Sequence, residues 1–518
     1  MSSLVKSFGY NVSGQLFARI ISFAINMYLL RVINNDVIGL VNVRLNLMYS
    51  TILFLTREPM RKANIDRDSV PQFVNILWLS PIIATILSVI CLAIWSIFST
   101  TSENVSLFVL LSFPLSSIIE AFAEPFATIS LRYSLGRHFA IGQGVLICMK
   151  RIFVFAALFI LPNVYHLDLF AYAQYFGSIV YLIFHVSAFL IYMKGESYPE
   201  LEKFQGFRSL LPDPSQGVDT ESVKAVSTMF SHSILKQFIA EGSAYVMTFT
   251  ELLSLKQQAV YDAVERIGSL VARAILAPLE ENGFAYFSNA IHKQSTVFNK
   301  STKEHDELIK TLSNILHIAG VIGFVACAFG VPYSPTAIYL YGGDLLYSNG
   351  GSVLLSLYSI YLFIMAVNGI TECFAMASMN NREVLTHGSF LLLTALGQLF
   401  LNFVLCYYFN SPGFIIANIV TMMIRIGYSW RHISNYLGPR TPSFFTILPT
   451  FDTITFIFAS FFATSFSYLI FGTTPGLSYL FSHLAIGAVL FSLLAMNIAQ
   501  HDPVFANIVN SYLKPHNV

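Results

Sequence analysis

Charged residues are scarce in this chain. Only 11% of its 518 residues are Asp, Glu, Lys or Arg, while 55% are hydrophobic. A typical soluble domain has about 25% charged residues, so this composition indicates a polytopic, all-α membrane protein. The formal net charge of +1 provides no basic surplus, and we therefore expect no nucleic-acid partner.

Motifs for cofactors, metals and catalysis are also missing. The five cysteines are scattered through apolar segments without CxxC spacing, which indicates packing rather than metal binding. The sequence has no glycine-rich phosphate loop, no nucleotide motif and no HExxH motif. Asp344 is the only acid in the longest loop expected on the luminal side, where a glycosyltransferase would need acidic residues for a metal or a base. We therefore expect no enzyme, no cofactor and no metal.

Hydrophobic runs predict about fourteen transmembrane helices. They cover residues 8–33, 37–56, 73–98, 105–131, 139–161, 168–193, 224–250, 258–287, 308–331, 352–379, 384–409, 412–430, 451–471 and 476–498. Five loops on one side of the membrane are rich in Lys and Arg, and the opposite loops are poor in both. The basic loops are 57–67, 132–138, 194–208, 292–310 and 431–440. By the positive-inside rule, both termini are expected to be cytosolic.

A polar stretch separates the first six predicted helices from the other eight. Residues 195–222 are rich in Pro, Gly and acids, which predicts a cytosolic linker. We expect an N-terminal lobe of six helices over 1–194 and a C-terminal lobe of six helices over 223–440, followed by two trailing helices and a cytosolic tail over 441–518. Six plus six helices are typical of repeat-built transporters, whose sites lie between the halves near the midplane.

One predicted helix carries an arginine deep inside its apolar stretch. Residues 37–55 hold no charge except Arg44, which lies roughly 10 Å deep at ~1.5 Å per residue. A guanidinium there costs a few kcal/mol, and polar residues occupy two sides of this helix, so it should line an interior. Two interpretations stay open: Arg44 ties neighbouring helices together, or it meets an anionic substrate in a cavity.

Further cations lie within or beside predicted helices of both halves. Arg and Lys suit phosphate or pyrophosphate, so a hydrated cavity lined by them would bind an anionic headgroup. Together with Arg44, the predicted substrate-binding residues are Arg57, Arg61, Lys150, Lys236 and Arg273.

Acids in the same segments are expected to balance these cations. Glu120 and Glu124 lie one turn apart and would repel unless protonated or paired, for example with Arg44 or Lys150. The residues predicted to act as counter-ions or structural partners are Glu120, Glu124, Glu241, Asp262, Arg266, Glu280 and Glu372. The pair formed by Asp262 and Arg266 leaves Arg273 freer to bind a ligand. A purely structural salt-bridge network is the alternative to a binding cavity.

Five stretches carry a family pattern. They are GLVNVRLNLMYSTILFLTREPMRKA at 39–63, YVMTF at 245–249, YDAVERIGSLVARAILAPLEEN at 261–282, IYLYGG at 338–343 and NGITECF at 368–374. They resemble the Rft family, eukaryotic endoplasmic reticulum proteins of N-glycan precursor assembly. The resemblance runs over nearly the whole chain and is weakest in the linker and after about residue 440.

The resemblance implies the fold of the multidrug/oligosaccharidyl-lipid/polysaccharide exporter superfamily, with two lobes around a cavity that opens alternately. It also implies a role in moving the dolichol pyrophosphate heptasaccharide, with two GlcNAc and five mannose units, from the cytosolic to the luminal leaflet. This dolichol-linked oligosaccharide lipid is anionic and would suit the buried cations. The family role leaves open whether the protein flips the lipid or acts as a non-transporting accessory that binds or delivers it.

The chain departs from the family pattern at one position. Members often have an arginine directly before the YVM tripeptide, where this sequence has Ala244. If that arginine binds substrate or pairs with Glu241, this chain must use Lys236 or Arg273 instead. A cation-coupled small-molecule exporter of the same superfamily is disfavoured, because the first predicted helix lacks the lone Asp that would indicate one.

Overall fold

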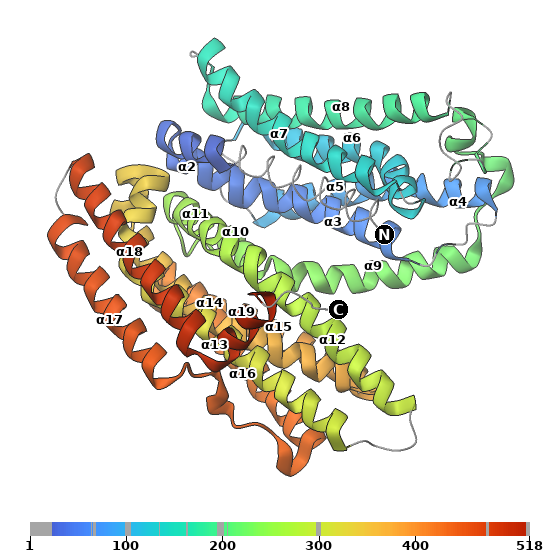
Figure 1. The fold of residues 1–518 in the computed structure, drawn as a ribbon. Coiled ribbons are helices and arrows are strands. Elements are labelled where there is room, and N and C mark those ends of the chain that lie inside the picture. Colours follow the sequence, from blue (N-terminus) through green and yellow to red (C-terminus); the bar gives the residue numbers. More distant parts are fainter. Residues whose placement is uncertain are drawn as a thin grey trace. The chain divides into compact units, whose positions relative to one another are not determined.

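The structure is a computed structural model that describes residues 23–63, 65, 69–98, 105–133, 135–161, 164–193, 201, 203–204, 206–296, 302–472 and 476–513. Within these residues every regular element is a helix (Figure 1). The chain forms two compact units, Met1–Ala259 and Val260–Val518.

The first unit contains one long composite helix against which several others pack. Helices α2, η1 and α3 run on as a single 28-residue apolar segment, Asn35–Lys62, whose last part, α3, packs against α5, α6 and α9. The π-helical turn η1 sits inside it. The unit's elements are α2 (Asn35–Gly39), η1 (Leu40–Leu45), α3 (Asn46–Lys62), α4 (Val70–Leu77), α5 (Leu79–Phe98), α6 (Leu107–Arg132), α7 (Gly136–Ile160), α8 (His166–Tyr192), η4 (Phe207–Leu210), η5 (Pro214–Gln216), α9 (Thr220–Ala240), α10 (Gly242–Phe249) and the start of α11 (Leu255–Val271).

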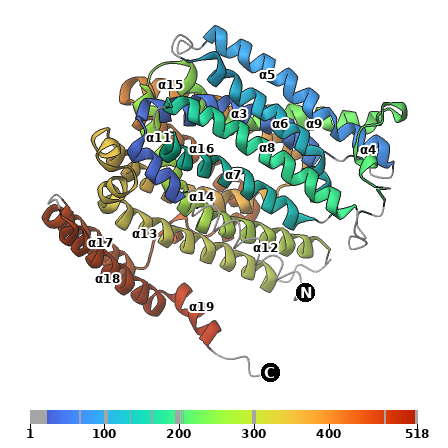
Figure 2. The ribbon, with the colours of Figure 1, turned by 90° about the horizontal axis from the view of Figure 1, so that it is seen from above.

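The second unit is built around the neighbouring helices α13 and α14. Helix α14 also packs against α12 and α16, and α17 and α18 form a pair (Figure 2). Helix α13 bends at Gly343, whose φ of 67° is left-handed. The elements after α11 are η6 (Ala272–Leu276), α12 (Ala277–Thr296), α13 (Thr302–Ser348), α14 (Gly351–Ser378), α15 (Asn381–Phe409), α16 (Pro412–Leu437), η7 (Gly438–Arg440), η8 (Phe444–Ile447), α17 (Phe451–Ser467), η9 (Tyr468–Gly472), α18 (Leu477–His501) and α19 (Pro503–Leu513).

In the described part of the chain, 11 helices are long and apolar enough to cross a membrane. They coincide with all the predicted transmembrane helices except the first, seventh and eighth, and confirm an all-helical polytopic membrane protein. Most of the first lies outside the described residues, which show a short apolar helix at Phe23–Val32. The seventh is broken at Glu241 into α9 and α10, and the eighth becomes α11, η6 and α12. Their polar residues make both less apolar than the other 11.

Helices α9 and α10 belong to the compact unit that ends at Ala259. Contacts to α3 explain this, because Gln237 donates to Thr51 Oγ1 at 3.1 Å and the Tyr245 hydroxyl lies 2.8 Å from the same atom. The position of α9 and α10 depends on these hydrogen bonds to α3. Counting apolar runs in the sequence cannot predict such bonds. The division into lobes at 1–194 and 223–440 stays a prediction.

The described part of the predicted linker is docked onto the first unit. Asn75 of α4 donates to the carbonyls of Asp213 and Gly217 at 2.6 and 2.7 Å and accepts from the Asp213 amide at 2.7 Å. The indole of Trp78 donates to the Leu210 carbonyl at 2.8 Å. Leu210 is fully buried in a hydrophobic core of the first unit. This segment therefore packs as part of that unit.

Candidate functional site

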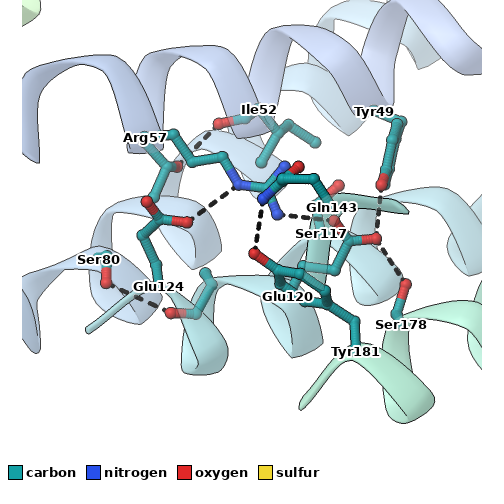
Figure 3. A network of polar contacts seen from close by, with 12 residues as sticks. Tyr49, Ile52, Arg57, Ser80, Ser117, Glu120, Glu124, Gln143, Ser178 and Tyr181 are labelled. Atoms are coloured by element: carbon teal, nitrogen blue, oxygen red, sulfur yellow. Dashed lines mark hydrogen bonds and ion pairs between the residues drawn. The ribbon is translucent and has the colours of Figure 1, made fainter. Parts of the chain in front are cut away.

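A group of five charged side chains joins α3, α6 and α7 in the first unit, and Figure 3 shows three of them, Arg57, Glu120 and Glu124. Helix α3 contributes Arg57 and Arg61, helix α6 contributes Glu120 and Glu124, and helix α7 contributes Lys150. We call these five residues the charge cluster. Arg57 and Arg61 are one turn apart, as are Glu120 and Glu124, so two rows of opposite charge face each other across two packed helices.

Glu120 is fully buried and has several donors. Its Oε2 accepts from Arg57 Nη2 at 2.8 Å, and its Oε1 accepts from Lys150 Nζ at 2.9 Å and from Ser178 Oγ at 2.8 Å. The Tyr49 hydroxyl also donates to Oε1 and accepts from Lys150 Nζ at 2.6 Å. A buried carboxylate persists only when it is paired and hydrogen-bonded, and these four partners meet that need.

Glu124 is held in the same way one turn further along α6. Its Oε2 accepts from Arg57 Nε at 3.1 Å and from Arg61 Nη2 at 2.8 Å, and Thr128 donates to its Oε1 at 3.3 Å. Arg57 therefore bridges both carboxylates, which lysine could not do with the same geometry, because only the guanidinium presents a planar fork of donors.

The charge cluster carries one more positive than negative charge. Its two carboxylate side chains are 0–1% exposed, whereas the side chains of Arg57, Arg61 and Lys150 are 14–19% exposed. The acids thus lie beneath the cations, and the accessible part of the cluster is cationic. This arrangement suits an anionic group such as a phosphate, which Arg and Lys recognise through charge-assisted hydrogen bonds.

Aromatic rings and uncharged polar side chains frame the cluster. Lys150 Nζ lies 4.2 Å from the ring centre of Tyr49, and the guanidinium of Arg61 lies 4.9 Å from that of Phe139. The Tyr181 ring lies beneath Arg57 at 5.7 Å, with its hydroxyl accepting from Gln143 at 2.8 Å. These contacts add cation–π attraction that fixes the orientation of the cations.

Arg44 lies elsewhere in the first unit. It is 3% exposed within η1, and its Nε donates to Gln258 Oε1 at 3.1 Å. Gln258, itself fully buried, donates to the carbonyls of Met247 and Leu253 at 3.1 and 2.9 Å. Arg44 therefore connects η1 to the turn between α10 and α11, a contact that favours the helix-tying interpretation over substrate contact.

Two other predicted residues of the first unit lie on α9 or at its end. Lys236 is 52% exposed and its Nζ lies 3.3 Å from Glu58 Oε1, which also pairs with Lys62 at 2.7 Å. Because Glu58 and Lys62 occupy a different face of α3 from Arg57 and Arg61, this group is separate from the charge cluster. Glu241 is partly buried at the break between α9 and α10.

The remaining predicted residues lie in the second unit. Arg266 Nε donates to Asp262 Oδ2 at 2.8 Å, and exposed Arg273, in the π-helical turn η6, bonds back to Ser269. Glu372 of α14 accepts two bonds from Arg425 Nη2, at 2.9 and 2.7 Å. Glu280 of α12 lies against Gly369 of α14.

Sequence reasoning missed the uncharged partners of the cluster. Ser178 and Tyr181 are three residues apart on α8 and both point toward α3 and α6 (Figure 3). Gln143 of α7 and Thr128 of α6 complete the set. The one sequence signal for these residues was their polarity within otherwise apolar runs. Many Ser and Thr residues with purely structural roles have the same property.

The fold is similar to those of two solved membrane proteins. It is similar to the lipid II flippase MurJ in an inward closed conformation, with a TM-score of 0.60 and 11% identity over 95% of this chain and 99% of that one. It is also similar to an inward-facing multidrug resistance MATE family transporter of the MOP superfamily, with a TM-score of 0.57 and 15% identity over 82% and 98%. At such low identity these likenesses establish the fold alone, that of a polytopic helical protein of the MATE and MurJ type.

The sequence identifies the family within this fold. The chain belongs to the Rft protein family, whose pattern matches residues 3–511, and this confirms the resemblance seen in the sequence. It is 63% identical over 519 residues to the Man(5)GlcNAc(2)-PP-dolichol translocation protein RFT1 of Caenorhabditis elegans, covering 99% of both chains. It is 31% identical to the protein of the same name from Xenopus tropicalis, covering 82% of this chain and 81% of that one.

Proposed function

We propose that this protein binds Man(5)GlcNAc(2)-PP-dolichol and moves it from the cytosolic to the luminal leaflet of the endoplasmic reticulum membrane. The names of its relatives from Caenorhabditis elegans and Xenopus tropicalis support this substrate and this action. The chemistry of the substrate agrees with the protein, because a pyrophosphate is anionic and its polyisoprenyl tail belongs in lipid.

The charge cluster is the observation that carries the proposal. Three partly exposed cations lie above two buried carboxylates, which leaves one surplus positive charge inside a membrane-spanning unit. Two carboxylates alone would suffice for two cations, so the third cation needs a further negative charge to reach neutrality. In this proposal Arg57, Arg61 and Lys150 contact the pyrophosphate, and Glu120 and Glu124 hold them in position.

Reconstitution tests the proposal directly. Purified protein is placed in unilamellar vesicles that contain the lipid-linked heptasaccharide, and a mannose-binding lectin outside the vesicles captures molecules that reach the outer leaflet. We expect capture of the inner-leaflet pool to be faster than in empty vesicles. Lys150→Met should slow it and weaken binding by about tenfold or more, since a charged hydrogen bond is worth about 1.5–3 kcal/mol. Lys224→Met, which removes an exposed lysine of α9, is the matched control.

The same experiment separates transport from an accessory role. A non-transporting protein that delivers the lipid would bind it with an affinity that depends on Lys150 but would leave the capture rate equal to that of empty vesicles. Binding that is equal in the wild-type protein, Lys150→Met and Lys224→Met would contradict a role for the charge cluster under either mechanism.

The direction of movement requires a defined orientation, and we propose that both termini face the cytosol. The excess of Lys and Arg in segments such as 132–138 and 431–440 supports this orientation. Epitope tags at each end should be cleaved by protease added to intact microsomes, and protection of either tag would overturn the assignment.

A further inference from the structure

Helices α12 and α14 of the second unit pack closely at a glycine, and a carboxylate occupies the space that a side chain would fill. A Cβ atom added to Gly369 would collide with Oε1, Cδ and Cγ of Glu280. Gly369 is buried, and Glu280 is about half-buried. The carboxyl group of Glu280 therefore lies against the backbone of α14.

Few hydrogen-bond donors lie at this contact between α12 and α14. Among the residues that the structure describes, none donates a hydrogen bond to the Glu280 carboxylate, whereas Glu372, one turn beyond Gly369, receives Arg425 and Asn368. Asn368 is 5% exposed, and its Oδ1 has no donor either. The one guanidinium at this contact, that of Arg425, thus bonds to Glu372, while the Glu280 carboxylate and the Asn368 amide oxygen receive no donor from the described residues.

The surroundings hold one permanent cation for several acids. The charged and titratable groups near Glu280 are Glu281 on its own helix, Glu372 and Cys373 on α14, and Arg425 on α16, and His387 of α15 lies beside Glu372. Arg425 is engaged by Glu372. His387 is 2% exposed, and its Nε2 faces Glu372 Oε1 at 3.7 Å, beyond hydrogen-bond distance.

We propose that Glu280 is a proton-binding site, and that its carboxyl group takes up a proton from water when α12 is packed on Gly369. The bound proton removes the second negative charge beside Glu372 and supplies the donor that this group of acceptors lacks. Two carboxylates that share one site in this way do not both ionise readily. Release of the proton restores a charge at the contact and weakens the packing of α12 against α14.

Infrared spectroscopy of the purified protein in lipid nanodiscs tests this site. We expect a protonated-carboxyl band that persists in the wild-type protein above the ~4.3 pKa of a free glutamate. Glu280→Gln should remove it, and Glu281→Gln, which changes the exposed neighbour, should keep it. An unchanged band in Glu280→Gln, or a band lost only in Glu372→Gln, would overturn the proposal.

Thermal unfolding provides a second readout that does not depend on assigning the band. If Glu280 holds its proton more tightly in the folded protein than in the unfolded chain, the free energy of unfolding falls as the pH rises above the pKa of glutamate in the unfolded chain. We expect Glu280→Gln to reduce this fall, because glutamine mimics the protonated acid, and Glu281→Gln to retain it. An identical pH dependence in the wild type and both variants would contradict the site, whatever the outcome of the transport assay.

Discussion

The stem of Lys150 lies across Gly177 of α8, and this glycine lets the lysine reach the charge cluster. A Cβ atom added to Gly177 would collide with Cγ of Lys150 and come within 3.1 Å of its Cε. From that position Nζ reaches Glu120 Oε1 at 2.9 Å. The site of one cation is therefore set by the absence of a side chain on a neighbouring helix.

Gly177→Ala should displace Lys150 and weaken its pairing with Glu120. Overpacking at such a contact costs about 1–3 kcal/mol, which denaturant unfolding of the detergent-solubilised protein would measure. Binding of the lipid-linked pyrophosphate should fall together with stability.

The control is the same substitution in a Lys150→Ala background. Once the lysine stem is gone, the added methyl group has space, so most of the penalty should disappear. The coupling between the two substitutions should then be about 0.5–3 kcal/mol. Purely additive effects would show that Gly177 does not position Lys150.

Glu124→Gln should destabilise the protein strongly. Glu124 is 1% exposed and pairs with both Arg57 and Arg61, so its loss leaves buried cations short of a counter-charge. Breaking a buried ion pair from one side costs about 3–5 kcal/mol.

Glu58→Gln is the matched comparison on the facing helix. Its partners Lys62 and Lys236 are 58% and 52% exposed, and pairs with exposed lysines contribute about 0–1 kcal/mol. Equal losses for the two variants in chemical unfolding would mean that the charge cluster is more hydrated than its burial indicates.

The sequence anticipated the residue types of the cluster better than their pairing. Helical spacing alone placed Glu120 beside Glu124. Lys150 was predicted as a cation inside a helix, and Arg57 and Arg61 as cations in the basic segment directly after one. Which cation meets which acid depends on the packing of α3, α6 and α7, which segments distant in the sequence determine.

Arg44 and α9 are two further cases in which contacts between distant segments could not be predicted from the sequence. The depth of Arg44 predicted a special partner, but its neutral partner Gln258 lies 214 residues away and carries no sequence signal. Most of the predicted transmembrane helices were recovered, because long apolar runs have few alternatives in a membrane. Helices α9 and α10 are too polar for that argument, and hydrogen bonds to Thr51 determine where they pack.

Gln258→Leu should loosen the turn between α10 and α11. The substitution removes two donors to backbone carbonyls and the acceptor for Arg44 Nε while keeping a similar volume. Each buried polar group left unsatisfied costs about 1–3 kcal/mol. Amide hydrogen exchange should accelerate across 247–258 and remain unchanged in α15 (Asn381–Phe409). Unchanged exchange across 247–258 would show that Gln258 does not hold the turn.

Asn75→Ala should release the linker from α4. The Asn75 side chain makes three hydrogen bonds to the backbone of Asp213 and Gly217, and it is 7% exposed. Without these bonds the segment loses its buried hydrogen bonds to Asn75, and local opening should become more frequent. Limited trypsin digestion should therefore cut after Arg208 several-fold faster than in the wild-type protein.

Gln72→Ala is the control for this release. It lies three residues before Asn75 on the same helix, and its side chain makes one exposed hydrogen bond of 3.3 Å, to the Gln216 carbonyl. Removing that bond should leave the rate of cleavage after Arg208 close to the wild-type rate, because an exposed donor is readily replaced by water. Equal acceleration in both variants would show that any lost contact frees the linker, and equal resistance would place its anchor in the buried side chain of Leu210 instead.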